Sequence, residues 1–145
     1  MREILFRGKW IDNGIWLYGS LRQYKDGTSG ICDRELEHTY RVDPNTVGEY
    51  TGLTDKDGKR IFEGDILELT CTEYPQDKLL FSVHFGPYEI SEEDEYDCVV
   101  GWYTKGVGKN ESWGKYSLFA DAERANLYYE VVGNIHDNPE LMEGD

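Results

Sequence analysis

The sequence predicts a mostly β protein, and three features of its composition favour that fold class. The 145 residues include 4 Trp, 11 Tyr and 5 Phe together with 8 Val, 8 Ile and 8 Thr, and such side chains pack well on a pleated, half-buried sheet. Alanine, the best helix former, occurs only three times, between positions 120 and 125. The 16 glycines supply the frequent turns that many short strands need.

The N-terminal part is expected to form an antiparallel hairpin followed by weaker structure. Strands are predicted over Glu3–Gly8 and Ile15–Tyr24. Between them, Asp12-Asn13-Gly14 predicts a tight turn, because Asn-Gly accepts the positive φ angles of a type I′ hairpin. A second turn at Lys25-Asp26-Gly27 precedes a weak apolar pair, Ile31-Cys32.

Two turns and one alternating strand are predicted in the middle of the chain. In the run Asp43-Pro44-Asn45-Thr46, the proline presets φ for a turn and the aspartate can accept backbone hydrogen bonds. Asp55-Lys56-Asp57-Gly58 predicts another tight turn. Alternation of apolar and polar residues resumes at Ile66 and ends near Cys71.

Three further strands are expected in the C-terminal half, over Leu79–Gly86, Cys98–Thr104 and Tyr128–Ile135. The segment Glu89–Asp97 holds six acidic residues among nine. Like charges at this density favour a solvated, mobile loop. We therefore expect a loop between the first two of these strands.

The residues before the last strand predict a long loop and little helix. Lys105–Lys115 contains three glycines around Trp113 and predicts a hairpin loop. Ser117–Asn126 predicts at most two helical turns. After the last strand, Asn138 and Pro139 are expected to end the sheet, because proline cannot donate to a ladder.

The charge is large, negative and uneven along the chain. There are 15 basic and 29 acidic residues, which gives a net charge of −14; residues 1–42 hold 7 basic and 6 acidic residues, whereas residues 71–145 hold 5 and 16. A field of this sign repels phosphate backbones and anionic membranes. We expect no direct nucleic-acid binding, no membrane association, and basic surfaces as favoured partners.

The cellular location of the protein is predicted from its N-terminal residues, its hydrophobic segments and its cysteines. The opening MREILFRGKW mixes charges with apolar residues, unlike a signal peptide. No segment reaches the roughly 18 consecutive apolar residues of a membrane span. Three widely spaced cysteines agree with a reducing environment, so the expected location is the cytoplasm.

No complete metal or cofactor motif is present in the sequence. Placing Gly58 at the sixth position of an EF-hand loop puts Leu53 and Gly64 at the first and twelfth positions, and neither offers a carboxylate. Zinc sites use clustered Cys and His, whereas these residues are spread along the chain, at Cys32, Cys71, Cys98, His38, His84 and His136. We expect no metal, no cofactor, buried cysteines and a His84 satisfied within its strand.

No catalytic motif is complete either. A nucleophile elbow, a P-loop and a dinucleotide-binding glycine motif are all missing parts that their chemistry needs. A paired-carboxylate hydrolase stays open as an alternative, but 29 acidic residues make accidental pairs common. Aromatic side chains at alternating positions are more often core than ligand-binding.

Several blocks of the sequence are similar to those of a known protein family. They are Arg7-Gly8-Lys9-Trp10, Trp16–Leu21, Val42–Leu53, Thr54–Ile66 and Glu130–Leu141. With these blocks in this order, the chain resembles the YopX family of phage and prophage proteins. The resemblance covers the chain except the acidic segment and Lys105–Ala125.

The resemblance implies a fold, a habit of self-association and an unassigned biochemical role. It implies a small N-terminal β region over residues 1–57 and an SH3-like β-barrel over residues 58–145. It implies no catalytic residue and no cofactor. The family-motif positions, which we expect to shape the backbone, are Asp43, Pro44, Gly48, Tyr50, Gly52, Asp57, Gly58, Glu63, Gly64, Asp65, Gly133, Asn134, Asn138 and Pro139.

Three functions from different classes follow from these observations. The favoured hypothesis is a non-enzymatic phage or prophage accessory protein in the host cytoplasm, which forms a homo-oligomer or binds a host or phage protein. The second is an acidic mimic of DNA that blocks a host nucleic-acid-binding protein through the carboxylates of Glu92, Glu93, Asp94 and Glu95. The least favoured is a small carboxylate-based enzyme.

Overall fold

A computed structural model describes residues 2–70, 76, 78–92, 95–112, 114–118 and 128–143. For residues 90–97 it describes only the backbone of those within strands. The chain divides into two compact units, Met1–Gly52 and Leu53–Asp145, called unit 1 and unit 2 below. The domain boundary expected between residues 57 and 58 remains a prediction.

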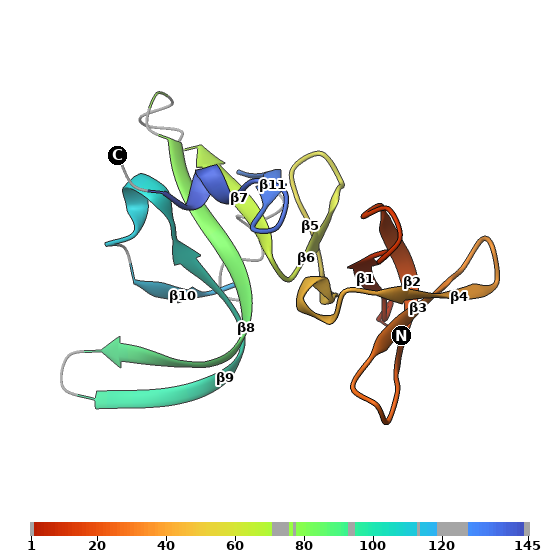
Figure 1. Ribbon diagram of the computed structural model, residues 1–145. Coiled ribbons are helices and arrows are strands. Elements are labelled where there is room, and N and C mark those ends of the chain that lie inside the picture. Colours follow the sequence, from red (N-terminus) through yellow and green to blue (C-terminus); the bar gives the residue numbers. More distant parts are fainter. Residues whose placement is uncertain are drawn as a thin grey trace. The chain divides into compact units, whose positions relative to one another are not determined.

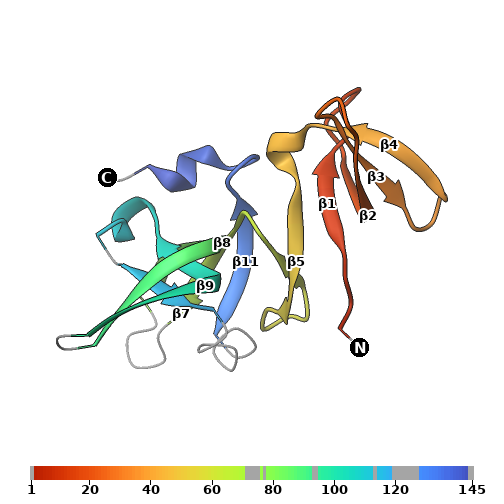
Figure 2. The same cartoon turned by 90° about the horizontal axis from the view of Figure 1, so that it is seen from below.

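Unit 1 is built on an antiparallel sheet in the order β4-β3-β2-β1-β5. Figure 2 shows β5 lying beside β1. β5 runs past the boundary between the units, so its last residues, Leu53 and Thr54, belong to unit 2. The bounds are β1 Phe6–Lys9, β2 Trp16–Gln23, β3 Ser29–Asp33, β4 His38–Val42, the 3-10 helix η1 Pro44–Thr46, and β5 Gly48–Thr54.

The predicted N-terminal hairpin is confirmed, but the expected type I′ turn is wrong, because that turn needs a positive φ at both central residues and Asn13 does not have one. Gly14 has a φ of 75°, and the backbone N–H of Trp10 donates to the carbonyl of Ile15 at 2.9 Å. Pairing in register then places Leu17 of β2 on the inner face, where it packs with Ile31 and Val42. This apolar cluster holds β3 and β4 in place, because burying such side chains contributes about 2 kcal/mol each. The sequence indicates only a weak apolar pair for β3 and does not predict β4.

Unit 2 contains a second antiparallel sheet in the order β10-β9-β8-β7-β11. The bounds are β6 Arg60–Phe62, β7 Asp65–Thr70, β8 Lys78–Glu92, β9 Glu95–Gly106, the 3-10 helix η2 Gly108–Asn110, β10 Lys115–Ser117, β11 Tyr129–Asn134 and the 3-10 helix η3 Pro139–Met142. Its core is built on Ile61, Leu67, Val83 and Leu118, each fully buried.

The predicted mostly-β fold class is confirmed by these two sheets. Strands β10 and β11 are the edges of the sheet of unit 2, and the described residues contain no closed barrel. The SH3-like barrel expected from the family stays a prediction.

Two expectations for the C-terminal half are wrong. The acidic segment Glu89–Asp97 is not a loop throughout, because β8 extends to Glu92 and β9 begins at Glu95. Continuous backbone pairing, from Phe81 with Gly106 to Glu92 with Glu95, carries the strands through the acidic residues. Cys98 is exposed rather than buried.

Other expectations fall partly or wholly outside the described residues. Most of the short helix expected over Ser117–Asn126 lies there, as do Trp113 and Cys71. The loop expected over Lys105–Lys115 holds the end of β9, the helix η2 and the start of β10. Cys32 is partly buried in β3.

Candidate interaction site

Strands β8 and β9 continue together beyond the strands that flank them. Among the described residues, β7 pairs with β8 only as far as Ser82, and β10 pairs with β9 only from Tyr103 to Lys105. Beyond these points β8 and β9 pair with each other alone. We call the two-stranded part, residues 84–92 and 95–101, the arm; Figure 1 shows it extending away from the other strands of its sheet.

One face of the arm continues the apolar core outward into solvent. Phe85 pairs across the ribbon with Trp102, and their rings meet edge to face with centroids 5.0 Å apart. Trp102 is buried in the core of unit 2, but Phe85 is 54% exposed. The next pair outward is Pro87 with Val100, and Val100 is 71% exposed. This face therefore presents three neighbouring apolar side chains to solvent.

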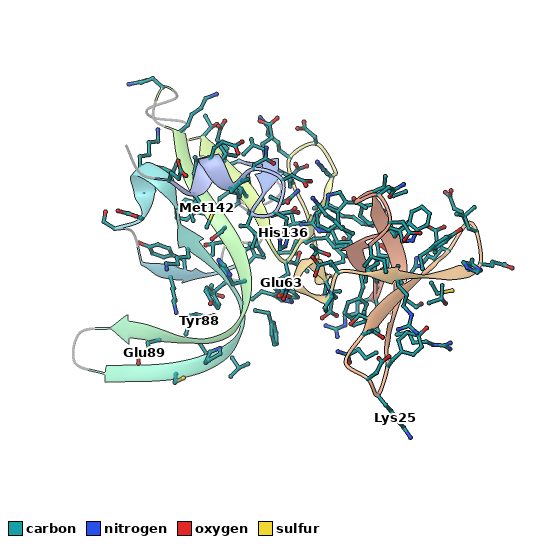
Figure 3. All side chains as sticks on the ribbon, in the orientation of Figure 1. Lys25, Glu63, Tyr88, Glu89, His136 and Met142 are labelled. Carbon is teal, nitrogen blue, oxygen red and sulfur yellow. The ribbon has the colours of Figure 1, made fainter. Side chains whose placement is uncertain are left out.

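The opposite face of the arm carries stacked rings. The Tyr103 ring lies 5.3 Å from His84, nearly parallel to it, and 5.3 Å from Tyr88. The ammonium of Lys115 lies 5.2 Å from the same ring, so a cation–π contact closes the group. Figure 3 labels Tyr88 and Glu89 on this part of the ribbon. These contacts stiffen the arm at its base.

The outer edge of β9 carries no charge or proline from Cys98 to Trp102, whereas Glu95 and Asp97 precede this segment on the same strand. Edge strands usually carry charges or proline, because unpaired N–H and C=O groups otherwise recruit another strand. Cys98-Val99-Val100-Gly101-Trp102 contains neither a charge nor a proline. A hollow of about 410 Å³ lies beside it, lined by Pro87, Tyr88, Glu89, Cys98 and Lys115. The arm is thus the candidate interaction site of unit 2.

The family-motif positions of unit 1 lie around η1 and β5. Asp43 caps η1, and its carboxylate accepts the backbone N–H of Asn45 at 3.0 Å, while Pro44 occupies the first turn. Gly48 is buried in β5 opposite Arg7. Tyr50 donates its backbone N–H to Leu5 at 2.8 Å, and Gly52 has a φ of 89°.

The positions between 57 and 65 form two turns of unit 2. Gly58 and Gly64 have φ angles of 81° and 89°, which glycine adopts without steric cost. Asp57 is exposed in the first turn and Glu63 is partly buried in the second. Asp65 is 1% exposed, and its carboxylate accepts the backbone N–H of Phe62 at 2.7 Å.

The last group closes the chain after β11. The side chain of Asn134 accepts the backbone N–H of His136 at 3.0 Å and of Asp137 at 2.9 Å. Asn138 accepts the backbone N–H of Asn134 at 3.1 Å, and Pro139 begins η3. A Cβ on Gly133 would lie 2.4 Å from the Asn138 side chain, so the turn requires glycine there.

Sequence reasoning did not include Asp55 among these positions. Its side chain is 3% exposed. One carboxylate oxygen accepts the backbone N–H groups of Asp57 and Lys59, each at 2.9 Å, and the other accepts that of Val131 at 2.9 Å. The first two bonds follow from an aspartate that opens a turn, but the third joins distant parts of the chain and leaves no local signal.

The structure therefore distributes the motif positions over several turns rather than gathering them at one point. Asn134 and Gly64 are brought together, since Ile135 donates its backbone N–H to the Gly64 carbonyl at 2.9 Å.

The family model of the YopX protein matches residues 5–143. The chain belongs to the YopX family. No curated protein matches it.

One cavity in this YopX-family chain places a serine beside a histidine. It encloses about 480 Å³ and is lined by Ser82, His84, Lys105, Gly106, Val107, Glu111, Ser112 and Met142. The hydroxyl of Ser82 and Nε2 of His84 lie 2.6 Å apart. Burial, and after it the charges of Lys105 and Lys115, lower the pKa of His84 below 6.5, so its imidazole is neutral at pH 7.

The pair lacks the access that a nucleophile needs. Ser82 is fully buried, whereas a serine nucleophile must reach the reacting atom of its substrate. Its hydroxyl also lies 3.5 Å from the Lys105 carbonyl. In this YopX-family chain the Ser82 hydroxyl therefore contacts polar atoms of β8 and β9, namely Nε2 of His84 and the Lys105 carbonyl.

The described parts of the chain also lack the features of a metal site and of a membrane-spanning helix. They hold no group of three or more His, Cys, Asp or Glu side chains placed to bind a metal ion. They also hold no helix that is long and apolar enough to span a membrane. The side chains of residues 90–97 lie outside what the structure describes, so the carboxylate array needed for DNA mimicry stays a prediction.

Proposed function

We propose that this YopX-family protein is a non-enzymatic accessory protein of a phage or prophage, which acts in the host cytoplasm and self-associates through the arm. A second copy adds a strand to the outer edge of β9. The observation that carries the proposal is the edge segment Cys98–Gly101, which has no charge or proline and lies next to an exposed apolar face. Both features are those that soluble proteins usually remove from an uncovered edge.

The geometry of the arm supports an antiparallel contact between identical strands. A two-fold axis brings the same patch of each copy together. The outer edge at Trp102 is already occupied, since Leu118 donates its backbone N–H to the Trp102 carbonyl at 3.1 Å. Strands pairing antiparallel about Val99 would place Val100 of each copy opposite Cys98 of the other. Such a ladder satisfies the outward backbone groups of Cys98 and Val100 and covers the Val100 side chain, which is 71% exposed.

A partner strand would also stabilise the arm. A two-stranded ribbon is marginally stable in water by itself, and three or more strands are needed for independent stability. Within unit 2 the base of the arm is held by core residues and stacked rings, but among the described residues its outer part is paired only between its own two strands. When two copies pair through β9, their two-stranded ribbons together form a four-stranded sheet at this point.

The test is light scattering and sedimentation velocity on the full chain. The wild-type protein is expected to form a dimer or larger assembly in the micromolar range. Val100→Lys places a charge on the exposed face and is expected to weaken self-association at least tenfold. The matched control is Leu36→Lys, since Leu36 is 62% exposed in unit 1 and the change in charge is the same.

Two results would overturn the proposal. A wild-type protein that stays monomeric at high concentration would exclude self-association. Equal loss of assembly in Val100→Lys and Leu36→Lys would move the contact away from the arm. Circular dichroism checks that both variants keep the β spectrum of the wild type.

A further inference from the structure

The outer face of the sheet of unit 1 gathers cations and has no carboxylate at its paired positions. Side chains of residues that pair across strands lie on the same face. The registers of β1 to β4 therefore define this face, which carries Arg7, Lys9, Arg22 and Arg41. The opposite face holds the apolar cluster of unit 1. We call the cationic surface the outer face.

The outer face contrasts with the charge of the rest of the chain. Residues 1–52 hold seven basic and eight acidic side chains, whereas residues 53–145 hold eight and 21. The registers place four cations of unit 1 on one face and direct Asp33 to the other. The expectation that the protein does not bind nucleic acid rested on the negative charge of the chain, most of which lies in residues 71–145. The sequence does not reveal how strand registers distribute the charges of unit 1 between two faces.

Aromatic rings are interleaved with these cations. The guanidinium of Arg7, which is itself buried, lies 4.7 Å from the centroid of Trp16, and the ammonium of Lys9 lies 5.4 Å from the same ring. Tyr18 is 43% exposed and pairs with Arg7 across β1 and β2. At this end of the face, rings and positive charge are therefore adjacent.

A second aromatic–cation pair lies at the other end of the outer face. The guanidinium of Arg41 lies 3.7 Å from the centroid of Tyr24. The Tyr24 ring covers Gly30, since a Cβ on that glycine would lie 3.4 Å from it. Arg22 is exposed directly opposite Gly30. Asp26, in the turn after β2, is the acidic group that interacts with Arg41; its pKa is lowered chiefly by hydrogen bonds from Thr28 and to a lesser extent by Arg41.

Small side chains separate the two ends. The row formed by Ser20, Cys32 and Thr39 runs across β2, β3 and β4 between the row of Tyr18 and the row of Arg22. Short side chains keep the floor of the sheet low, so a flat group can approach the rings on either side. This arrangement combines stacking surfaces with positive charges along one face.

We propose that the outer face of unit 1 binds single-stranded nucleic acid. Base–aromatic stacking on a sheet face, combined with cations that contact the phosphates, is the general way in which proteins hold single strands without sequence preference. Tyr18 supplies an exposed stacking surface beside Trp16, and Arg22 and Arg41 contact phosphates. Duplex nucleic acid fits less well, because its bases are stacked on each other and do not expose their faces.

The test uses the full chain and a fluorescein-labelled oligothymidylate of about 12 nucleotides, followed by fluorescence anisotropy at about 50 mM salt. Binding is expected, and it should weaken as salt rises. Arg22→Glu is expected to raise the Kd at least tenfold. Lys59→Glu makes the same change of charge at an exposed position of unit 2 and is expected to raise the Kd less than threefold.

A second variant separates stacking from charge. Tyr18→Ser keeps every charge and removes an exposed ring, so it is expected to weaken binding about five- to tenfold. An abasic oligomer with the same number of phosphates should bind correspondingly less tightly than oligothymidylate.

Three outcomes would overturn the proposal. They are an absence of binding at low salt, equal affinity for oligothymidylate and for either the abasic oligomer or polyglutamate, and equal effects of Arg22→Glu and Lys59→Glu. Affinity for polyglutamate would instead indicate an acidic protein as the partner. Thermal unfolding of each variant checks that its fold is retained, and Arg22→Gln replaces Arg22→Glu if it is not.

Discussion

The carboxylate of Asp55 accepts a hydrogen bond from the backbone N–H of Val131 at 2.9 Å, although 76 positions separate the two residues. The same side chain accepts two further N–H groups within its own turn. Lys56 adds a backbone bond to the Tyr129 carbonyl at 3.0 Å. One buried carboxylate thus ties the turn before β6 to the last strand of the sheet.

Replacing Asp55 by asparagine should destabilise unit 2. The amide keeps one acceptor oxygen but places an NH₂ group against a backbone N–H that needs an acceptor. Hydrogen bonds to a charged group contribute about 1.5–3 kcal/mol each, so we expect Asp55→Asn to lower the free energy of unfolding by about 2–4 kcal/mol. Urea unfolding followed by circular dichroism measures the change.

Asp57→Asn is the control for that experiment. Asp57 lies in the same turn, but its side chain is exposed, so the substitution should change stability by less than about 0.5 kcal/mol. Equal losses in the two variants would show that the turn is sensitive to charge alone and that the bond to Val131 contributes little.

Gly19→Ala should separate the strands of unit 1. A Cβ at this position would lie 1.8 Å from the backbone carbonyl oxygen of Cys32 on the neighbouring strand, and a backbone atom cannot rotate away as a side chain can. We expect a loss of about 3 kcal/mol or more, at the upper end of overpacking effects. Thermal unfolding reports the change.

Gly114→Ala serves as the comparison for Gly19→Ala. A Cβ on Gly114 meets nothing within 4 Å, so its unfolding temperature should stay within a few degrees of the wild type. If Gly19→Ala also unfolds at the wild-type temperature, the close approach of β2 and β3 at this point is wrong.

Stability should fall in mild acid because of His84. Its pKa lies below 6.5 in the folded protein, chiefly through burial and then through Lys105 and Lys115, whereas in the unfolded chain it is near 6.5. Above pH 6.5 the imidazole is neutral in both states. As the pH falls from 6.5 toward the folded pKa, only the unfolded chain takes up a proton readily, so the free energy of unfolding decreases.

The measurement is urea unfolding at about pH 7.5 and pH 5.5 for the wild type and for His84→Gln. The variant should lose less stability between the two values, because glutamine does not titrate. A wild-type protein that gains stability on acidification, or a variant with an identical loss, would contradict the assignment to His84.

Leu118→Ala should open a cavity in the core of unit 2. Leu118 is fully buried and packs in the cluster that includes Trp102 and Phe81. Large-to-small changes at such positions cost about 2–5 kcal/mol. Leu36→Ala is the matched control, since Leu36 is 62% exposed and should lose little. Chemical denaturation that gave equal midpoints for the two variants would place Leu118 outside the core.

Sequence alone predicts the elements whose signals are local. The turn at Asn13-Gly14 needs only the positive φ of its glycine, and the strands on either side alternate clearly. The strands β3 and β4 are weaker in sequence, because their stability comes from packing against Leu17 and not from their own residues.

Features that depend on contacts between distant parts of the chain could not be predicted from the sequence alone. The acidic residues after Glu89 indicate a loop by charge, but pairing with β9 outweighs the repulsion in the fold. The role of Asp55 depends on Val131, which only the folded chain brings near. The outer face of unit 1 depends on strand registers, which place residues from four strands on one surface.

The isolation of the arm has a consequence for deuterium exchange. Along an antiparallel ribbon, the amides of successive residues point alternately toward the partner strand and away from it. In a single copy, the outward-pointing amides of Cys98 and Val100 have no acceptor among the described residues and should exchange within seconds, while their inward neighbours are protected. An added strand would slow the fast set and leave the slow set unchanged, so the labelling pattern would identify both the docked edge and its register.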